Sequence, residues 1–190
     1  SKTKVIVPMH YGGVSCAMEE IMEIAAYYNL LVVEDAAQAM LSKHKNNYLG
    51  TIGHMGCLSF HETKNIISGE GGALIINDKS LVERAEIIWE KGTNRKQFFK
   101  KEVEKYSWVD IGSSFLPSEL VGAFLYAQLE QADRIIFDRC QIFQKYYQSL
   151  SMLEQKGFLK RPFWENGNEC NGHIFYIIAR STDERARLIK

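Results

Sequence analysis

The sequence predicts an α/β protein built on a mostly parallel β-sheet. Two apolar runs, residues 4–9 and 30–33, flank a segment whose apolar residues recur at helical spacing. A strand, a helix and a second strand with short connections form a βαβ unit, whose strands are parallel and whose connection is right-handed. Two further apolar runs, residues 58–60 and 73–76, are bounded by turn residues, which is typical of buried strands.

Composition argues against several kinds of partner. The chain has 190 residues, of which 46% are hydrophobic and 24% are charged, as is ordinary for a globular protein. Lys and Arg together number 23, and Asp and Glu also number 23. Without a basic excess we expect no nucleic-acid partner, and without an apolar run of about 20 residues we expect no membrane partner.

The cysteines and histidines show no ligand pattern. Cys16, Cys57, Cys140 and Cys170 lack C-x-x-C spacing, and we expect reduced, buried thiols in a cytoplasmic protein. No pair among the five histidines has ligand spacing on a predicted helix, so we expect no metal site.

The first helix is predicted for residues 15–29, with Ser15 as its N-cap. Parallel strands deliver their carboxyl ends to one edge of a sheet, so His10 and Asp35 should lie at the same edge. A carboxylate at a buried strand end is costly unless it is paired. Asp35 therefore either shapes a turn or faces a cationic group of a ligand.

Lys64 follows the apolar run 58–60 and precedes a glycine-rich turn, residues 69–72. A lysine just past a buried strand lies at the edge where open α/β sheets bind ligands. Partial desolvation there favours the neutral amine, which is a nucleophile toward carbonyl groups. For Lys64 alone, a place on a solvated loop is the alternative, but Asp35 and Lys64 together favour a site.

The next elements alternate between helices and exposed segments. Residues 43–50 are predicted to form a loop or short hairpin. Asp78 is a candidate N-cap, and Ser80 with Glu83 fits a capping box for a helix that ends before Gly92. Residues 93–116 mix basic and aromatic residues without periodicity, so they form either a solvated loop or a site or interface.

A long helical pattern occupies residues 117–150. It would extend about 50 Å, too long for one small domain, so we expect it to bend and to link two domains. Strands are predicted at residues 159–163 and 173–179, and a helix begins at Thr182.

Three motifs in this order resemble the sugar aminotransferases of the DegT/DnrJ/EryC1/StrS family. They read E-D-A-A-Q-A at residues 34–39, S-F-H-E-T-K-N at 59–65 and G-E-G-G-A at 69–73. A fourth stretch, W-V-D-I-G-S-S-F-L-P-S-E-L at residues 108–120, looks closest to the dTDP-4-amino-4,6-dideoxygalactose transaminases. The resemblance covers essentially the whole chain.

The resemblance implies the aspartate-aminotransferase-like fold, which is fold type I of pyridoxal-phosphate enzymes. Residues 1–116 would form the C-terminal part of the large domain. Residues 117–150 would be the interdomain helix, and residues 151–190 the start of a small C-terminal α+β domain. Relatives carry a further segment before the position that matches Lys4, so we expect the chain to be part of a longer polypeptide.

The resemblance also implies pyridoxal 5'-phosphate as the cofactor and assigns residues to it. Lys64 would form the Schiff base, and Asp35 would pair with the pyridine nitrogen. Gln38 would lie beside the ring, and Ser59 would contact the phosphate. A desolvated carboxylate opposite the pyridine nitrogen keeps it protonated, which makes the cofactor an electron sink.

Three other residues have less defined parts. His10 and His61 flank the site in sequence, and each either contacts substrate or serves in packing. Many relatives contribute an asparagine to the neighbouring subunit's phosphate from the segment that matches residues 112–120, whereas this chain has Leu116 there.

The implied reaction is transfer of an amino group from L-glutamate to a keto-sugar nucleotide, in deoxysugar or cell-surface polysaccharide biosynthesis. The first candidate for the acceptor is dTDP-4-keto-6-deoxy-D-glucose. Relatives act as homodimers, so we expect one here. Two alternatives stay open, a sugar dehydratase, whose relatives carry histidine where this chain has Lys64, and an inert piece that keeps only the fold or oligomerisation.

Overall fold

The computed structural model describes residues 2–164 and 167–190. Its strands are β1 (Val5–Ile6), β2 (Leu31–Asp35), β3 (Lys43–His44), β4 (Asn47–Tyr48), β5 (Met55–Ser59), β6 (Gly72–Ile76), β7 (Leu159–Lys160), β8 (Asn168–Glu169) and β9 (Ile178–Ala179). Its α-helices are α1 (Met18–Tyr28), α2 (Val82–Trp89), α3 (Arg95–Phe99), α4 (Glu119–Glu130), α5 (Ala132–Ser149), α6 (Ser151–Gln155) and α7 (Thr182–Ile189). Two 3-10 helices complete the set, η1 (Tyr11–Gly13) and η2 (Lys79–Leu81).

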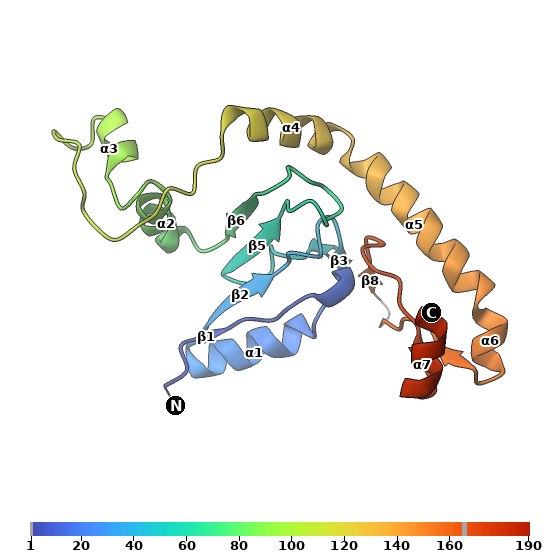
Figure 1. The fold of residues 1–190 in the computed structure, drawn as a ribbon. Helices are drawn as coiled ribbons and strands as arrows, with labels where there is room; N and C mark the ends of the chain where they lie inside the picture. The colour runs from blue at the N-terminus through green and yellow to red at the C-terminus, as the bar shows by residue number, and fades with distance from the viewer. Residues whose placement is uncertain (1, 165–166) are drawn as a thin grey trace.

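The central sheet has the strand order β1-β2-β5-β6 (Figure 1). β1 pairs with β2 in parallel, β2 pairs with β5 in parallel, and β6 runs antiparallel to β5. The predicted βαβ unit and the α/β class are therefore confirmed.

Helix α1 covers one side of this sheet (Figure 1). Its Met18 and Ala25 pack with Val32 of β2 in a fully buried cluster. The predicted cap of this helix is wrong: α1 begins at Met18 after Ala17, and no side chain caps it. The Ser15 hydroxyl instead donates to the carbonyl of Cys16 at 2.6 Å, and residues 14–17 have no regular secondary structure.

The segment before β5 is the predicted hairpin. β3 and β4 pair antiparallel, and β3 also pairs with β8 from the far end of the chain. The hairpin thus joins the first third of the chain to the residues around 168.

The long helical pattern bends, as predicted. Helix α4 begins after Ser118, whose hydroxyl accepts from the amide of Val121 at 3.3 Å. It ends at Glu130, and α5 continues after Gln131. Figure 1 shows the two helices arching over the side of the sheet opposite α1.

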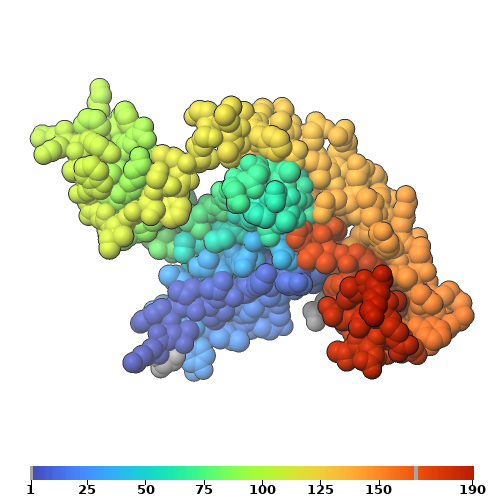
Figure 2. Space-filling model, in the orientation of Figure 1, coloured from blue at the N-terminus to red at the C-terminus, as the bar shows by residue number. Residues whose placement is uncertain are grey.

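The segment between α2 and α4 projects away from the central sheet, at the upper left of Figure 2. Asp78 caps η2 through the amide of Ser80, whereas α2 starts only at Val82 and the capping box with Glu83 is not formed. The helix ends earlier than predicted, at Trp89, and Lys91 with φ +65° rather than Gly92 takes the C′ position. Gly92 follows it and donates to the carbonyl of Ile87 at 2.7 Å.

The C-terminal strands are shorter than predicted, since only β7 and β9 of the two apolar runs form a ladder. None of the helices in the described residues is apolar over a length that could cross a bilayer. Within residues 2–164 and 167–190 no group of three acidic, cysteine or histidine residues could hold a metal ion.

Candidate active site

Two neighbouring strands bring polar residues to one edge of the sheet. Asp35 is the last residue of β2, and it pairs in parallel register with Cys57 of β5. Ser59, two residues further on, ends β5 at the same edge. The chain after β1 also reaches this edge, because the amide of His10 donates to the carbonyl of Asp35 at 3.0 Å.

The Asp35 carboxylate is only partly engaged. Its Oδ1 accepts from the amide of Ala37 at 3.1 Å, which is the turn contact expected of a strand-end aspartate. No ion pair engages it in the described part of the chain. Burial, followed by the negative charge of Asp35, raises the pKa of the neighbouring Cys57 thiol. The carboxylate is therefore a half-buried negative charge that still has capacity for a ligand.

Lys64 lies on the loop between β5 and β6, and its side chain is half-buried. Its backbone amide donates to the carbonyl of His61 at 2.9 Å. Among residues 2–164 and 167–190, no hydrogen bond or ion pair engages its ammonium group. A half-buried lysine without a carboxylate partner favours the site over the solvated-loop alternative.

Backbone hydrogen bonds fix the Lys64 loop. The amides of Phe60 and Ser68 donate to the carbonyls of Gly71 and Phe60, at 2.9 Å and 2.7 Å. Gly71 has φ +154°, and a Cβ on it would come within 2.7 Å of the Ser68 hydroxyl oxygen. The positive φ of this glycine is what allows the loop to close on itself.

Ser59 and His61 lie beside the same loop. The Ser59 hydroxyl oxygen accepts from the amide of His61 at 3.3 Å, so its own proton is available to a ligand. His61 remains partly exposed, with Nδ1 2.9 Å from the Thr63 hydroxyl oxygen and Nε2 3.7 Å from Glu70. Its position is compatible with either of its two predicted parts.

Gln38 ties two loops of the edge together. Its Oε1 accepts from the amide of Gly12 at 2.7 Å, which joins the chain after β2 to η1. The amide oxygen is thereby committed, and the NH₂ group is the part of Gln38 that remains for a ligand.

His10 serves in packing. It is fully buried, its Nε2 lies 2.9 Å from Glu34, and its Nδ1 accepts from the amide of Cys16 at 3.2 Å. Both ring nitrogens are engaged inside the protein, which favours the packing alternative over substrate contact.

Glu34 was not among the predicted site residues. This carboxylate is fully buried and accepts from His10 and from the amides of Gly50, Ile52 and Gly53. Burial alone would raise its pKa, but the His10 contact and the three amides lower it. Strand alternation was the available signal, because Val32 and Glu34 share the buried face of β2 while Asp35 lies on the other.

A second missed group comes from the C-terminal part of the chain. Asn171 is buried, with 1% of its surface exposed, and bonds the carbonyls of Gln38 and Met40. Asn65, the neighbour of Lys64, bonds both Asn171 and His173. These contacts join residues more than a hundred positions apart, so no local pattern could reveal them.

The model of the DegT/DnrJ/EryC1/StrS aminotransferase family matches residues 1–190. The chain belongs to this family. The GDP-perosamine synthase of Escherichia coli O157:H7 is 37% identical over 156 residues, which are 82% of this chain and 41% of that protein. The UDP-4-amino-4,6-dideoxy-N-acetyl-beta-L-altrosamine transaminase of Helicobacter pylori is 31% identical over 131 residues, which are 69% of this chain and 34% of that protein.

Among solved structures, the aminotransferase of Psychrobacter cryohalolentis is 28% identical with a TM-score of 0.84. The match covers 95% of this chain and 48% of that chain. The DegT/DnrJ/EryC1/StrS chain described here therefore spans less than half the length of these relatives.

The residues at the sheet edge fit the pyridoxal phosphate on which this family depends. The donor set contains an amine without a carboxylate partner, a half-buried carboxylate and a hydroxyl whose proton is available. The amine suits the aldehyde of the cofactor, the carboxylate suits its pyridine nitrogen, and the hydroxyl suits its phosphate.

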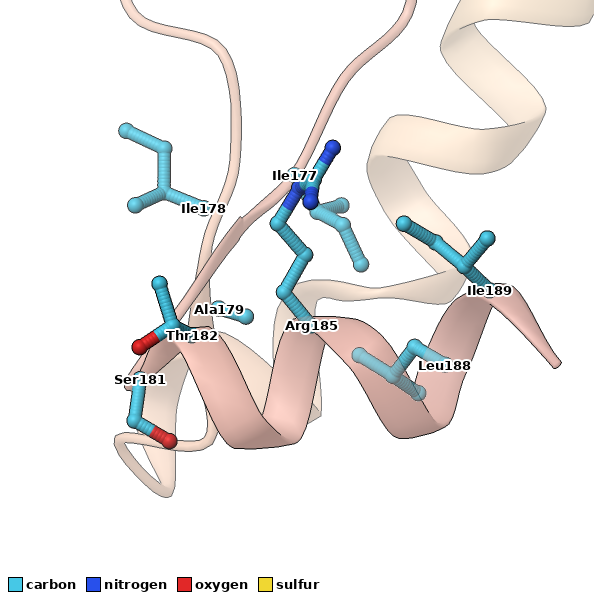
Figure 3. A pocket seen from close by; sticks show the side chains of 8 residues that line it. All are labelled: Ile177, Ile178, Ala179, Ser181, Thr182, Arg185, Leu188 and Ile189. Carbon is cyan, nitrogen blue, oxygen red and sulfur yellow. The ribbon is translucent and has the colours of Figure 1, made fainter.

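A pocket elsewhere in the chain lacks the polar groups that would suit pyridoxal phosphate. It lies between α7 and residues 177–179, and Figure 3 shows its mainly aliphatic lining. Arg185 is the only charged side chain among the eight that line it, and none of the predicted site residues does so.

Proposed function

We propose that the chain is the part of a pyridoxal-phosphate-dependent aminotransferase that carries the reacting lysine. The enzyme would transfer an amino group from L-glutamate to a keto sugar linked to a nucleotide. The observation that carries the proposal is the shared edge: β2 and β5 are parallel, and they deliver Asp35, Ser59 and the loop of Lys64 together.

Each residue has one part to play. When bound, pyridoxal phosphate supplies an electron sink that is effective while its ring nitrogen is protonated. Asp35 holds the proton on that nitrogen through its negative charge. The Ser59 hydroxyl would donate to the phosphate, and the Gln38 amide would contact the ring. The Lys64 amine would hold the cofactor covalently and, once released, would move a proton at the carbon that carries the amino group.

The substrate class is proposed from the relatives. The names of two of them refer to GDP-linked and UDP-linked sugars, so the nucleotide differs within the family. The stretch at residues 108–120 makes dTDP-4-keto-6-deoxy-D-glucose our first candidate for the acceptor. Lys64 stands where the related dehydratases have histidine, and this favours transamination over dehydration.

A product assay tests the proposal. The full-length protein, with pyridoxal phosphate and L-glutamate, is incubated with dTDP-, GDP- and UDP-linked 4-keto sugars, and mass spectrometry detects the amino sugar and 2-oxoglutarate. We expect product with at least one sugar, none with Lys64→Ala, and unchanged product with the control Lys79→Ala, whose side chain is exposed. Protein that binds pyridoxal phosphate but forms 2-oxoglutarate with none of these sugars would contradict the substrate class.

A further inference from the structure

Arg139 lies on the buried face of helix α5. Ala132, two turns earlier, packs with Phe60 and Ile66 in a buried cluster, and Phe143, one turn later, is also buried. Residues at spacings of four and seven share one face of a helix. Since Phe60 and Ile66 belong to the loop between β5 and β6, Arg139 extends from the side of α5 that covers this loop.

The backbone of α5 at Arg139 is also in contact with the segment that reaches the neighbour of Lys64. Gly172 has φ +63°, and a Cβ on it would lie 2.9 Å from the carbonyl oxygen of Arg139. The next residue, His173, has its Nδ1 2.8 Å from Oδ1 of Asn65, which follows Lys64 in the chain. These contacts connect Arg139 on α5 to the loop of Lys64.

The guanidinium group of Arg139 has hydrogen-bonding capacity that the protein does not use. Its Nε atom is buried and has no hydrogen-bond partner among the described residues. Over that same part of the chain, no carboxylate forms an ion pair with it. Other arginines do pair with carboxylates, namely Arg84, Arg95, Arg161 and Arg180. A buried N–H group without a partner costs free energy, so Nε of Arg139 calls for an acceptor from outside these residues.

The surroundings of Arg139 favour a negatively charged ligand. Arg139 and Lys64 are both half-buried, and neither ammonium nor guanidinium has a carboxylate partner in the described ranges. Two unpaired cations in one region create a positive potential, which attracts anions. A guanidinium group matches carboxylate and phosphate oxygens with parallel N–H donors. Because the Arg139 side chain is only half-buried, part of its surface is open to a ligand.

We propose that Arg139 binds an oxyanion, a carboxylate or a phosphate, of a ligand that occupies the Lys64 edge. The oxyanion accepts from Nε and from one Nη group in parallel. The source of the oxyanion rests on the proposed function, in which the amino donor carries carboxylates while the cofactor and the sugar nucleotide carry phosphates. Lysine would be a poor replacement, since its ammonium group is a point charge without this paired geometry.

The first test follows the Nε–Hε signal of Arg139 by nitrogen-15 NMR in the full-length protein without cofactor. Arg139→Lys, which lacks the signal, assigns it. Sodium phosphate and sodium acetate are titrated separately, and sodium chloride keeps the ionic strength constant. We expect the signal to shift and saturate with at least one of the two oxyanions but not with chloride alone.

Arg134 is the internal control, because it lies on the same helix and is exposed. Its Nε–Hε signal should show no saturating shift. The absence of a saturating shift at Arg139, or an equal shift at Arg134, would overturn the proposal. Because neither cofactor nor substrate is present, this result is independent of whether the protein is an aminotransferase.

The second test identifies the source of the oxyanion through transamination by the full-length holoenzyme. Arg139→Gln and Arg139→Lys should each weaken one ligand by about ten- to a hundredfold, since a charge-assisted contact is lost. A rise in KM confined to L-glutamate assigns the carboxylate of the donor. A rise confined to the sugar nucleotide, or to the concentration of pyridoxal phosphate that gives half-saturation, assigns a phosphate. The control Arg134→Gln should match the parent.

Other outcomes separate this proposal from its alternatives. Unchanged constants in both Arg139 variants, or equal losses for every ligand together with a lower Tm, would mean that Arg139 is structural and would refute the proposal. If the parent forms no product with any keto sugar, the proposed function has failed. The NMR titration alone then decides whether Arg139 binds an oxyanion.

Discussion

Glu34 and Asp35 are adjacent residues in different surroundings. Glu34 is fully buried and accepts four hydrogen bonds, whereas Asp35 is half-buried and accepts one. Alternation along β2 therefore separates a structural carboxylate from the one that we propose holds the proton on the cofactor ring.

For Asp35→Asn we expect retained pyridoxal phosphate and a loss of turnover on the order of a hundredfold, because a neutral amide does not hold the proton on the ring. Thermal unfolding should be nearly unchanged. Turnover close to that of the parent, measured with a saturating donor and acceptor, would show that Asp35 has no part in the chemistry.

Glu34→Gln should behave in the opposite way. The variant weakens the bonds to His10 and to the amides of Gly50, Ile52 and Gly53, so the free energy of unfolding should fall by about 1–3 kcal/mol. Denaturant titration measures this change. Unchanged stability would mean that the buried carboxylate is not what fixes that loop.

At the scale of the element, a charged cluster fastens the β3–β4 hairpin to α1. Glu19 lies 2.7 Å from Nε2 of His44 and 2.5 Å from the ammonium group of Lys45. Hydrogen bonds from Lys45 and His44 lower the pKa of Glu19 to about 2. Burial alone would lower the pKa of His44, but hydrogen bonds to Asn168 and Glu19 raise it.

The cluster predicts a pH window for stability. The Glu19 contribution is present above its ordinary pKa of 4.5 and is lost as the pH falls toward about 2. The His44 contribution is present below its ordinary pKa of 6.5 and is lost as the pH rises through the raised value. The difference in Tm between the parent and Glu19→Gln should therefore be largest between these two ordinary values. Glu23→Gln, on the same helix, is the control, and a difference that does not vary with pH would refute the coupling.

The elements differ in how well the sequence predicts them. Strand–helix–strand order follows from local periodicity, and the bend in the long helix follows from the length of the helical pattern; both are found. The cap at Ser15 fails because α1 begins only at Met18 and the Ser15 hydroxyl bonds the carbonyl of Cys16 instead. The Asn171–Asn65–His173 contacts depend on chain segments that meet only after folding, so spacing carries no signal of them. The assignments of Lys64, Asp35, Gln38 and Ser59 came from motif resemblance and stay predictions.

At the scale of the whole molecule, large apolar side chains are exposed at the start of α4 and in the segment between α3 and α4. Trp108, Ile111 and Leu120 are 74%, 85% and 84% exposed. The homodimer expected from the family resemblance would cover such a surface. Light scattering of the full-length protein at micromolar concentration should show a dimer, and Ile111→Glu should shift it toward monomer more than Tyr27→Glu does. A monomeric parent would contradict the prediction.

The central claim is that Lys64 is the amine that holds the cofactor. Protein incubated with pyridoxal phosphate is reduced with borohydride, digested, and analysed by mass spectrometry. We expect the cofactor mass on the peptide that contains Lys64, no label in Lys64→Ala, and parent-level label in the control Lys79→Ala. Label on another lysine, or equal label in Lys64→Ala, would contradict the account.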